Sequence, residues 1–279
     1  DEYRRSGKPT GPLHGIPVAV KDIVGTVDMP TECGTVIRKG KSYSQNAEII
    51  DLLISEGAIV MGKTATSELA FLGPPKTTNP HDYSRTPGGS SSGSAASVAS
   101  YMAPLSIGSQ TGGSVIRPAS YCGVVGYKPT YGLISRNGVL RTSQTLDHIG
   151  MFGRNVEDVA LLAKALIKKD KQDPASIHYS SENILAETKK GPLFEPKFIF
   201  YKTEFWKTID KKSKEAFEYS NGEIVTGNVD ILYREFHDFI DIFLSGVPMT
   251  YDSLGQTYNL ESAGMIEIFA EQGGQRINM

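Results

Sequence analysis

The sequence predicts an α/β protein built around a buried sheet, and two observations lead to that prediction. Over the first 170 residues, short runs of β-branched and other apolar residues alternate with segments whose apolar residues recur at helical spacing. The composition, with 39% hydrophobic residues, 22% charged residues and a net charge of -2, is typical of a globular protein. A length of 279 residues is enough for one large domain or two modest ones.

The first elements follow one another as strand, helix and strand. Residues 16–24 (IPVAVKDIV) are a short β-branched run, which predicts a strand. Residues 46–57 (NAEIIDLLISEG) have apolar residues at helical spacing and end on a glycine, which predicts a helix. Residues 58–62 (AIVMG) are short and apolar, as a buried strand is. Residues 103–110 (APLSIGSQ) are predicted as a strand that runs into a loop.

The composition of the sequence changes after about residue 170. Before that point, residues 155–169 (NVEDVALLAKALIKK) predict an amphipathic helix with Asn155 as its N-cap. Beyond it the chain becomes polar, and we place only a strand at residues 196–202 and a charged helix at residues 211–220.

Residues 57–64 (GAIVMGKT) match the pattern of a phosphate-binding loop. Such a loop needs a strand before its first glycine and flexible backbone between its glycines. Here the first glycine follows a predicted helix, and residues 58–61 favour a strand, so Lys63 and Thr64 are expected after that strand. We therefore do not expect nucleotide binding.

Several function classes are not expected. Lysine and arginine are spread along the chain, which gives no basis for binding nucleic acid. No apolar run approaches the roughly 18 residues of a membrane span, and the sequence shows no signal peptide, so we expect no membrane partner and a location in the cytosol or an organelle matrix. Cys33 and Cys122 are far apart and the histidines form no closely spaced pair, so we expect no metal, no cofactor and no disulfide.

Residues 87–97 (PGGSSSGSAAS) have the composition of a flexible linker. The sequence that follows is instead dense in apolar and β-branched residues, which favours close backbone packing at an active-site loop. A second glycine pair, Gly112 and Gly113, directly precedes Ser114. Flexible glycines before a serine can direct backbone N–H groups at an oxyanion.

A serine nucleophile requires a base, and no histidine is near either Gly/Ser segment. Lys21, in the buried-looking strand, is the candidate, because burial disfavours the ammonium form and lowers the pKa of lysine from about 10.4 toward neutrality. The alternative is a structural lysine that pairs with Asp22 at the end of the strand.

Four blocks of sequence resemble the amidase signature family and arrive in its order over roughly residues 9–165. They are GPLHGIPVAVKD, GAIVMGKTATSELA, PGGSSSGSAASVAS and TGGSVIRPASYCGVVGYKPTYG. The resemblance implies one amidase-signature domain over residues 1–279, with a mixed central sheet and helices on both faces. It also implies a domain longer than this chain, so parts of it, above all in the poorly matched region 170–279, are expected to be missing.

The resemblance also implies a catalytic triad of two serines and a lysine. Ser114 takes the place of the nucleophile, Ser90 that of the bridging serine that follows a cis peptide bond, and Lys21 that of the base. The implied oxyanion hole consists of the backbone N–H groups of Thr111, Gly112, Gly113 and Ser114.

Further polar residues near these motifs have open roles. Ser91 and Ser92 are interpreted either as assisting the site or as caps of the Ala/Ser-rich helix that follows. Arg117 is displaced by one position from the arginine of the commoner family pattern, so no role is transferred to it. Gln110 replaces the aspartate usual in the amidotransferase subunits of the family, which favours a free-standing amidase.

The function that the resemblance implies is hydrolysis of a small-molecule carboxamide through a serine acyl-enzyme. Two alternatives remain: a glutaminase subunit of a tRNA-dependent amidotransferase, which requires partner chains, and a non-catalytic fragment of the family. The sequence does not identify the amide. An apolar patch on a C-terminal segment would be a natural surface for a homodimer.

Overall fold

The computed structural model describes residues 2–7, 10–71, 73–190, 207, 211, 270–272 and 275–277. The chain divides into two units, Asp1–Lys190 and Gly191–Met279. In the second unit the described strands are β6 (Ala270–Gln272) and β7 (Gln275–Ile277), which pair antiparallel. The strand predicted at residues 196–202 and, apart from Lys211, the helix predicted at residues 211–220 lie outside the described residues. The single domain over the whole chain stays a prediction.

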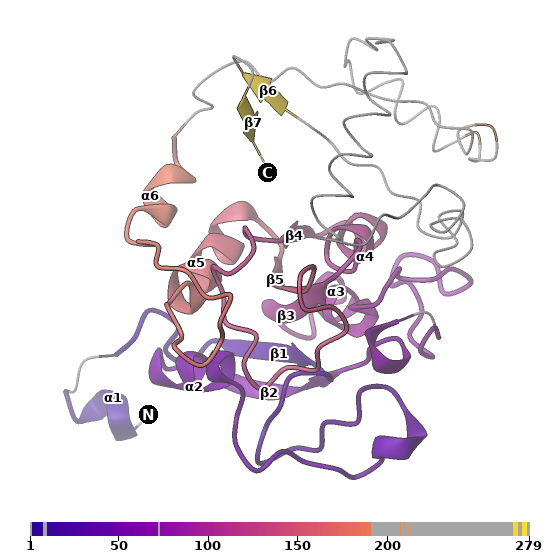
Figure 1. The fold of residues 1–279 in the computed structure, drawn as a ribbon, viewed down its shortest axis with the longest axis horizontal. Helices are drawn as coiled ribbons and strands as arrows, with labels where there is room; N and C mark the ends of the chain where they lie inside the picture. Colours follow the sequence, from indigo (N-terminus) through magenta and orange to yellow (C-terminus); the bar gives the residue numbers. More distant parts are fainter. Residues whose placement is uncertain are drawn as a thin grey trace. The chain divides into compact units, whose positions relative to one another are not determined.

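The first unit carries the mixed arrangement of helices and strands that the sequence predicts (Figure 1). In chain order its elements are α1 (Glu2–Arg5), β1 (Pro17–Lys21), a 3-10 turn (Val36–Arg38), α2 (Glu48–Ser55), β2 (Ile59–Thr64), a 3-10 turn (Glu68–Ala70), α3 (Ser92–Ala99), β3 (Leu105–Gln110), α4 (Ile116–Cys122), β4 (Val125–Tyr127), β5 (His148–Gly153), α5 (Val156–Leu166) and α6 (Ile184–Glu187). No helix in the part of the chain that the structure describes has the length and apolar character needed to cross a bilayer.

The five strands of the first unit form one sheet in the order β2-β1-β3-β5-β4. Strand β1 is parallel to both β2 and β3, whereas β5 is antiparallel to β3 and to β4. The predicted mixed sheet is therefore confirmed. Because β1, β2 and β3 run in the same direction, their carboxyl ends meet at one edge of the sheet, where α/β proteins commonly bind ligands.

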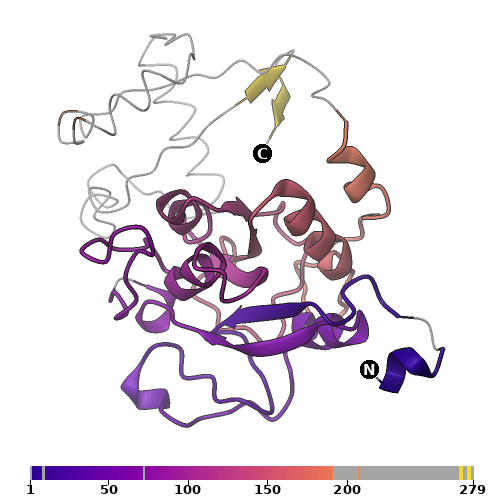
Figure 2. The same cartoon turned by 180° about the vertical axis from the view of Figure 1, so that it is seen from behind.

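Helices cover both faces of this sheet, as predicted. Helices α2 and α5 pack against each other on one face, and α3 and α4 pack against each other on the other. Figure 2 shows the same arrangement from behind. Strand β5 shows how both faces become apolar, because Ile149 and Met151 join the larger core under α2 and α5, whereas Phe152 joins the smaller core under α3 and α4.

Local signals in the sequence mark the ends of two helices. Helix α2 ends at Ser55, two residues after its last buried leucine, Leu53, and Gly57 follows with a φ of 84°. Asn155 caps α5 as predicted, since its side chain accepts a hydrogen bond from the backbone N–H of Asp158. The Ala/Ser-rich helix α3 packs tightly: a Cβ on Gly93 would lie 2.4 Å from the backbone nitrogen of Ala65.

Strand β2 differs from its prediction at its end. Lys63 and Thr64 belong to the strand and do not follow it, because β1 continues alongside them and pairs Lys21 with Thr64. The pairing shifts by one residue between Val18 and Ala19, where the partners change from Val60 to Gly62, so β2 carries one extra residue there. The phosphate-loop match is thus extended strand.

Candidate active site

The predicted catalytic residues lie at the edge of the sheet where the parallel strands end. Lys21 is the last residue of β1, and Gln110 is the last residue of β3. Strand β5 runs the other way, so its first residue, His148, pairs with Gln110 at the same edge. This geometry brings together the residue that ends β1, the segment that follows β3 and the segment that precedes β5.

Lys21 is fully buried and has hydroxyl partners. Its Nζ lies 2.7 Å from Ser90 Oγ and 2.8 Å from Ser109 Oγ. Burial lowers the pKa of Lys21 to about 7, although the charge of Asp147 acts in the opposite direction. A large share of Lys21 is therefore neutral at neutral pH and able to accept a proton.

The alternative pairing of Lys21 with Asp22 is wrong. The Asp22 carboxylate lies 3.6 Å from the Nζ of Lys63, and it accepts the backbone N–H of Glu32. Because side chains alternate along a strand and Asp22 comes directly after Lys21, the two residues turn to different surroundings.

The Ser90 segment is held by contacts on both sides of its peptide bond. The Gly89–Ser90 peptide bond is cis, Ser90 is 2% exposed, and its carbonyl accepts the N–H of Ser67 at 3.1 Å. The carbonyl of Gly89 accepts two bonds from the guanidinium of Arg117, at 3.1 Å from Nε and 2.7 Å from Nη2. The segment predicted from composition as a linker or an active-site loop is thus a well-packed turn at the start of α3.

Ser91 occupies the N-cap position of α3, but neither Ser91 nor Ser92 caps the helix through its hydroxyl. The Ser91 hydroxyl donates to the carbonyl of Ser109 and accepts the N–H of the same residue, which joins the turn to β3. The Ser92 hydroxyl donates to the carbonyl of Gly88 at 2.7 Å. Neither hydroxyl accepts a backbone N–H of the first turn of α3, so the cap position is filled without a side-chain bond.

Ser114 contacts the Ser90 segment through its backbone and not through its hydroxyl. The N–H of Ser91 donates to the carbonyl of Ser114 at 3.3 Å. Within the described residues, the Ser114 hydroxyl makes no hydrogen bond, and Ser114 is half-buried. The structure therefore brings Lys21 and Ser90 into contact, and it places Ser114 beside them through the backbone.

The segment before Ser114 is open and depends on glycine. A Cβ at Gly112 or Gly113 would meet no atom within 4 Å, and Gly113 has a φ of 134°. Among the residues that the structure describes, the N–H groups of Gly112, Gly113 and Ser114 have no acceptor. Gln110 supports the end of the segment, since its Oε1 accepts the N–H groups of Val115 and Ile116.

Two residues near the site were missed by the sequence analysis. Ser109 lies inside β3 and looks in the sequence like any small residue of a strand, yet its hydroxyl contacts Lys21. Asp147 precedes β5 and is 8% exposed, and its carboxylate accepts the Thr111 hydroxyl at 2.6 Å. Its only sequence signal is an acidic residue directly before an apolar strand.

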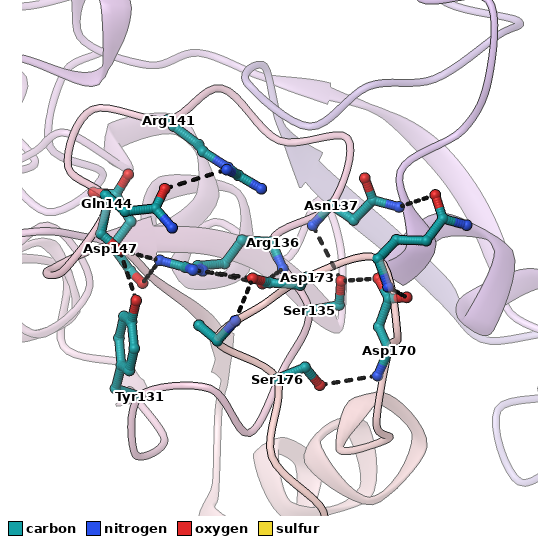
Figure 3. A network of polar contacts seen from close by, with 12 residues as sticks. Tyr131, Ser135, Arg136, Asn137, Arg141, Gln144, Asp147, Asp170, Asp173 and Ser176 are labelled. Atoms are coloured by element: carbon teal, nitrogen blue, oxygen red, sulfur yellow. Dashed lines mark hydrogen bonds and ion pairs between the residues drawn. The ribbon is translucent and has the colours of Figure 1, made fainter.

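A buried ion pair supports the loop that carries Asp147 (Figure 3). The guanidinium of Arg136 binds the carboxylate of Asp173 through Nη2 at 3.0 Å and Nε at 3.1 Å. Its Nη1 donates to the carbonyl of Gln144 at 2.8 Å, and its guanidinium lies 4.7 Å from the centre of the Tyr131 ring. Burial opposes ionisation of Asp173, but the bonds from Arg136 outweigh it and lower the pKa of this carboxyl to about 2.

A cavity of about 350 Å³ is lined by Asp22, Gly34, Ala65, Thr66, Glu68, Gly73, Pro74 and Pro75. Lys21, Ser90 and Ser114 do not line it.

The described residues contain no cluster of metal-binding side chains. Nowhere among them do three or more His, Cys, Asp or Glu side chains gather as a metal group would require. Cys33 and Cys122 are free and buried, and burial raises the pKa of the Cys122 thiol to about 11, so it is not a nucleophile.

Comparisons with known proteins identify relatives of this fold and site. The family described as Amidase matches residues 1–229. A glutamyl-tRNA(Gln) amidotransferase subunit of Methanosarcina mazei is 46% identical over 191 residues, which are 65% of this chain and 40% of that protein.

Two solved structures resemble the chain at more than 30% identity. The peptide amidase of Stenotrophomonas maltophilia matches with a TM-score of 0.63 and 34% identity, over 66% of this chain and 41% of that chain. A structure reported as a vestigial protein complex, which reveals the evolutionary origins of an s-triazine catabolic enzyme, matches with a TM-score of 0.71 and 32% identity, over 78% and 49% of the two chains. The chain thus spans half or less of the length of these relatives.

Proposed function

The chain belongs to the amidase family, and on that premise we propose that it carries the catalytic centre of a serine amidohydrolase. The observation that carries the proposal is the contact between Lys21 and Ser90, at 2.7 Å, in a site where the lysine is fully buried and has a pKa of about 7. A lysine in these surroundings can act as a base toward a hydroxyl group.

The proposed reaction begins with a proton relay. Neutral Lys21 takes the proton of the Ser90 hydroxyl, Ser90 takes that of Ser114, and the Ser114 oxygen attacks the amide carbonyl. The relay requires the Ser114 hydroxyl to come within hydrogen-bond distance of the Ser90 hydroxyl. The tetrahedral oxyanion would accept hydrogen bonds from the N–H groups of Thr111, Gly112, Gly113 and Ser114.

The relay then runs in reverse and completes the cycle. The proton held by Lys21 returns through Ser90 to the amide nitrogen, the C–N bond breaks, and ammonia or an amine leaves. The acyl group remains as an ester on Ser114. Water attacks this ester with Lys21 and Ser90 again accepting the proton, which releases the carboxylic acid and restores the serine.

The substrate we propose is a small-molecule carboxamide. The family relationship supports an amide bond as the target.

The second candidate function is the glutaminase subunit of a tRNA-dependent amidotransferase. It is favoured by the 46% identity to the amidotransferase subunit of Methanosarcina mazei. Gln110 argues against it, but the structure gives this side chain a local role at the end of β3, where its Oε1 binds two backbone N–H groups. Glutamine hydrolysis that appears only with partner chains would establish this candidate over the first.

The test of the proposal is covalent labelling with a fluorophosphonate serine reagent, read by intact mass and peptide mapping. We expect a single adduct on Ser114 in the wild type and no adduct in Ser114→Ala. The matched control is Ser120→Ala, a change at an exposed serine of α4, which should retain labelling. A wild type without an adduct would overturn the assignment and favour a non-catalytic fragment. An adduct that survives in Ser114→Ala would show that Ser114 is not the nucleophile.

A further inference from the structure

Asp147 links two parts of the site that are distant in sequence. It lies directly before β5, whose first residue pairs with the last residue of β3. The Thr111 hydroxyl donates to Asp147 Oδ1 at 2.6 Å, and Thr111 is the first residue of the proposed oxyanion segment. The carboxylate is therefore attached to the backbone that must hold the N–H groups in place.

The carboxylate is itself held by its own loop. Oδ2 accepts the N–H groups of Thr142 and Ser143 at 2.8 and 2.9 Å, and Oδ1 also accepts the Thr142 hydroxyl at 2.8 Å. The Arg136 guanidinium fixes the same loop through the carbonyl of Gln144 (Figure 3). A carboxylate with four donors in a buried site has little freedom to turn, so it can act as a rigid anchor for Thr111.

Asp147 is also the carboxylate whose charge acts on Lys21. Its negative charge raises the pKa of Lys21 against the larger effect of burial. Two other charged side chains from the surrounding elements bind backbone carbonyl groups. Lys63 of β2 donates to the carbonyl of Val24, and Arg117 of α4 donates to the carbonyl of Gly89.

Apart from Asp22, the remaining elements around Lys21 add no charge. Strand β3 and helix α3 have no titratable side chain. His148 of β5 is neutral at neutral pH, because burial lowers its pKa to about 4. Asp22, next to Lys21, lies 3.6 Å from Lys63.

We propose that Asp147 is a positioning residue of the site, which anchors the oxyanion segment through the Thr111 hydroxyl and sets a negative charge near the Lys21 ammonium. The inference rests on the proposed function, since it assigns a purpose to the segment from Thr111 to Ser114. It divides into two separable effects, one mechanical and one electrostatic.

The electrostatic effect is tested with Asp147→Asn, which keeps the shape of the side chain and removes the charge. The readout is the titration of Lys21 followed through its ¹³Cε resonance, assigned by comparison with Lys21→Met. We expect a wild-type midpoint of about 7 and a midpoint lower by about half a pH unit in Asp147→Asn, because a nearby opposite charge stabilises the ammonium. An unchanged midpoint would overturn this part of the inference.

The mechanical effect is tested with Thr111→Val, which removes the hydroxyl and keeps the charge of Asp147. We expect the rate of fluorophosphonate labelling at Ser114 to fall about tenfold, since a small misplacement of catalytic groups is costly, with the Lys21 midpoint unchanged. Thr111→Ser restores the hydroxyl and is expected to recover most of the lost rate. A Thr111→Val variant that labels as fast as the wild type would overturn the anchoring role.

The two proposals fail in distinguishable ways. A wild type that is not labelled at Ser114 refutes the proposed nucleophile, whereas the Lys21 midpoints need no substrate and still decide on the charge of Asp147. Labelling that falls equally in all variants together with a loss of thermal stability and no change of midpoint would mean that Asp147 is only structural.

Discussion

The pKa values of two buried cations in the first unit, Arg136 and Lys21, are shifted in opposite directions. Burial works against the charge of Arg136, but the ion pair with Asp173 outweighs it and raises the pKa of the guanidinium. Lys21 faces two hydroxyl groups and no carboxylate within hydrogen-bond distance among the described residues, and burial lowers its pKa to about 7. The partner of each cation therefore decides whether its charge is permanent or can change near neutral pH.

The difference separates a structural role from a chemical one. A permanent ion pair such as that of Arg136 can organise the carbonyl groups of a loop, as it does at Gln144. A cation without a counter-ion destabilises the folded state as long as it is protonated, but it gains the ability to accept a proton. The contrast predicts that removing Lys21 harms activity, whereas removing the partner of Arg136 harms stability.

The largest effect is expected from Lys21→Met. The variant loses the proposed base, so the labelling rate at Ser114 should fall by about 10²- to 10⁴-fold. Its thermal stability should not fall, because methionine fills a similar volume without a charge to bury. Kinetics of labelling and a melting curve measure the two quantities. Lys168→Met, a change at a half-exposed lysine, is the control, and a Lys21→Met variant that labels normally would remove the chemical half of the contrast.

The next effect is expected from Asp173→Asn. This change leaves the Arg136 guanidinium buried without a counter-ion, and the free energy of unfolding should fall by about 3 to 5 kcal/mol. Urea unfolding measures the loss. Glu56→Gln serves as the control, since its pair with Lys168 lies at the surface and should contribute less than about 1 kcal/mol. Equal losses in the two variants would show that the buried pair is not special.

A further effect is a dependence of stability on pH. Lys21 has a pKa of about 7 in the folded protein, whereas the ordinary pKa of lysine is 10.5. Between these values the unfolded chain binds a proton that the folded chain lacks, so the stability of the wild type should rise with pH by about 1 kcal/mol per unit. Urea unfolding of the wild type and Lys21→Met across this window measures the difference, and parallel curves for the two proteins would contradict the lowered pKa.

Asp173 gives the opposite window and an internal check on the sign. Its pKa in the folded protein is lowered to about 2, so its contribution is present above its ordinary pKa of about 3.8. That contribution is lost as the pH falls through the range between these two values. Near neutral pH, the change of stability with pH should therefore come from the titration of Lys21 and not from that of Asp173.

Much of the fold, and the contact between Lys21 and Ser90 within the site, could be predicted from the sequence. Strands β1, β2 and β3 and helices α2, α3 and α5 were predicted from the sequence, whereas α1, α4, β4, β5 and α6 were not. The contact between Lys21 and Ser90 agrees with the order of the family motifs. The roles of Ser90, Ser114 and the oxyanion segment rest on a family resemblance and stay predictions. Local pattern alone left Lys21 between a base and a partner of Asp22.

The residues that were missed depend on distant pairing. Asp147 is 33 positions beyond Ser114, and it reaches Thr111 only because β5 returns antiparallel to β3. Ser109 contacts Lys21 because β1 and β3 are neighbours in the sheet, which no local signal states. The expected caps at Ser91 and Ser92 failed for the same reason, since strand β3 competes for the Ser91 hydroxyl.

The extra residue in β2 affects only the point where it is inserted, and the pairing with β1 continues after it. After the shift, Lys63 reaches the carbonyl of Val24, and the Thr64 hydroxyl lies 2.7 Å from that of Ser94 in α3. Paired residues of neighbouring strands lie on the same face, so deleting Met61 would restore an unbroken ladder and leave Lys63 beside Val20 and Thr64 beside Lys21. The bulge therefore lets β2 hold one extra residue while both side chains keep their partners.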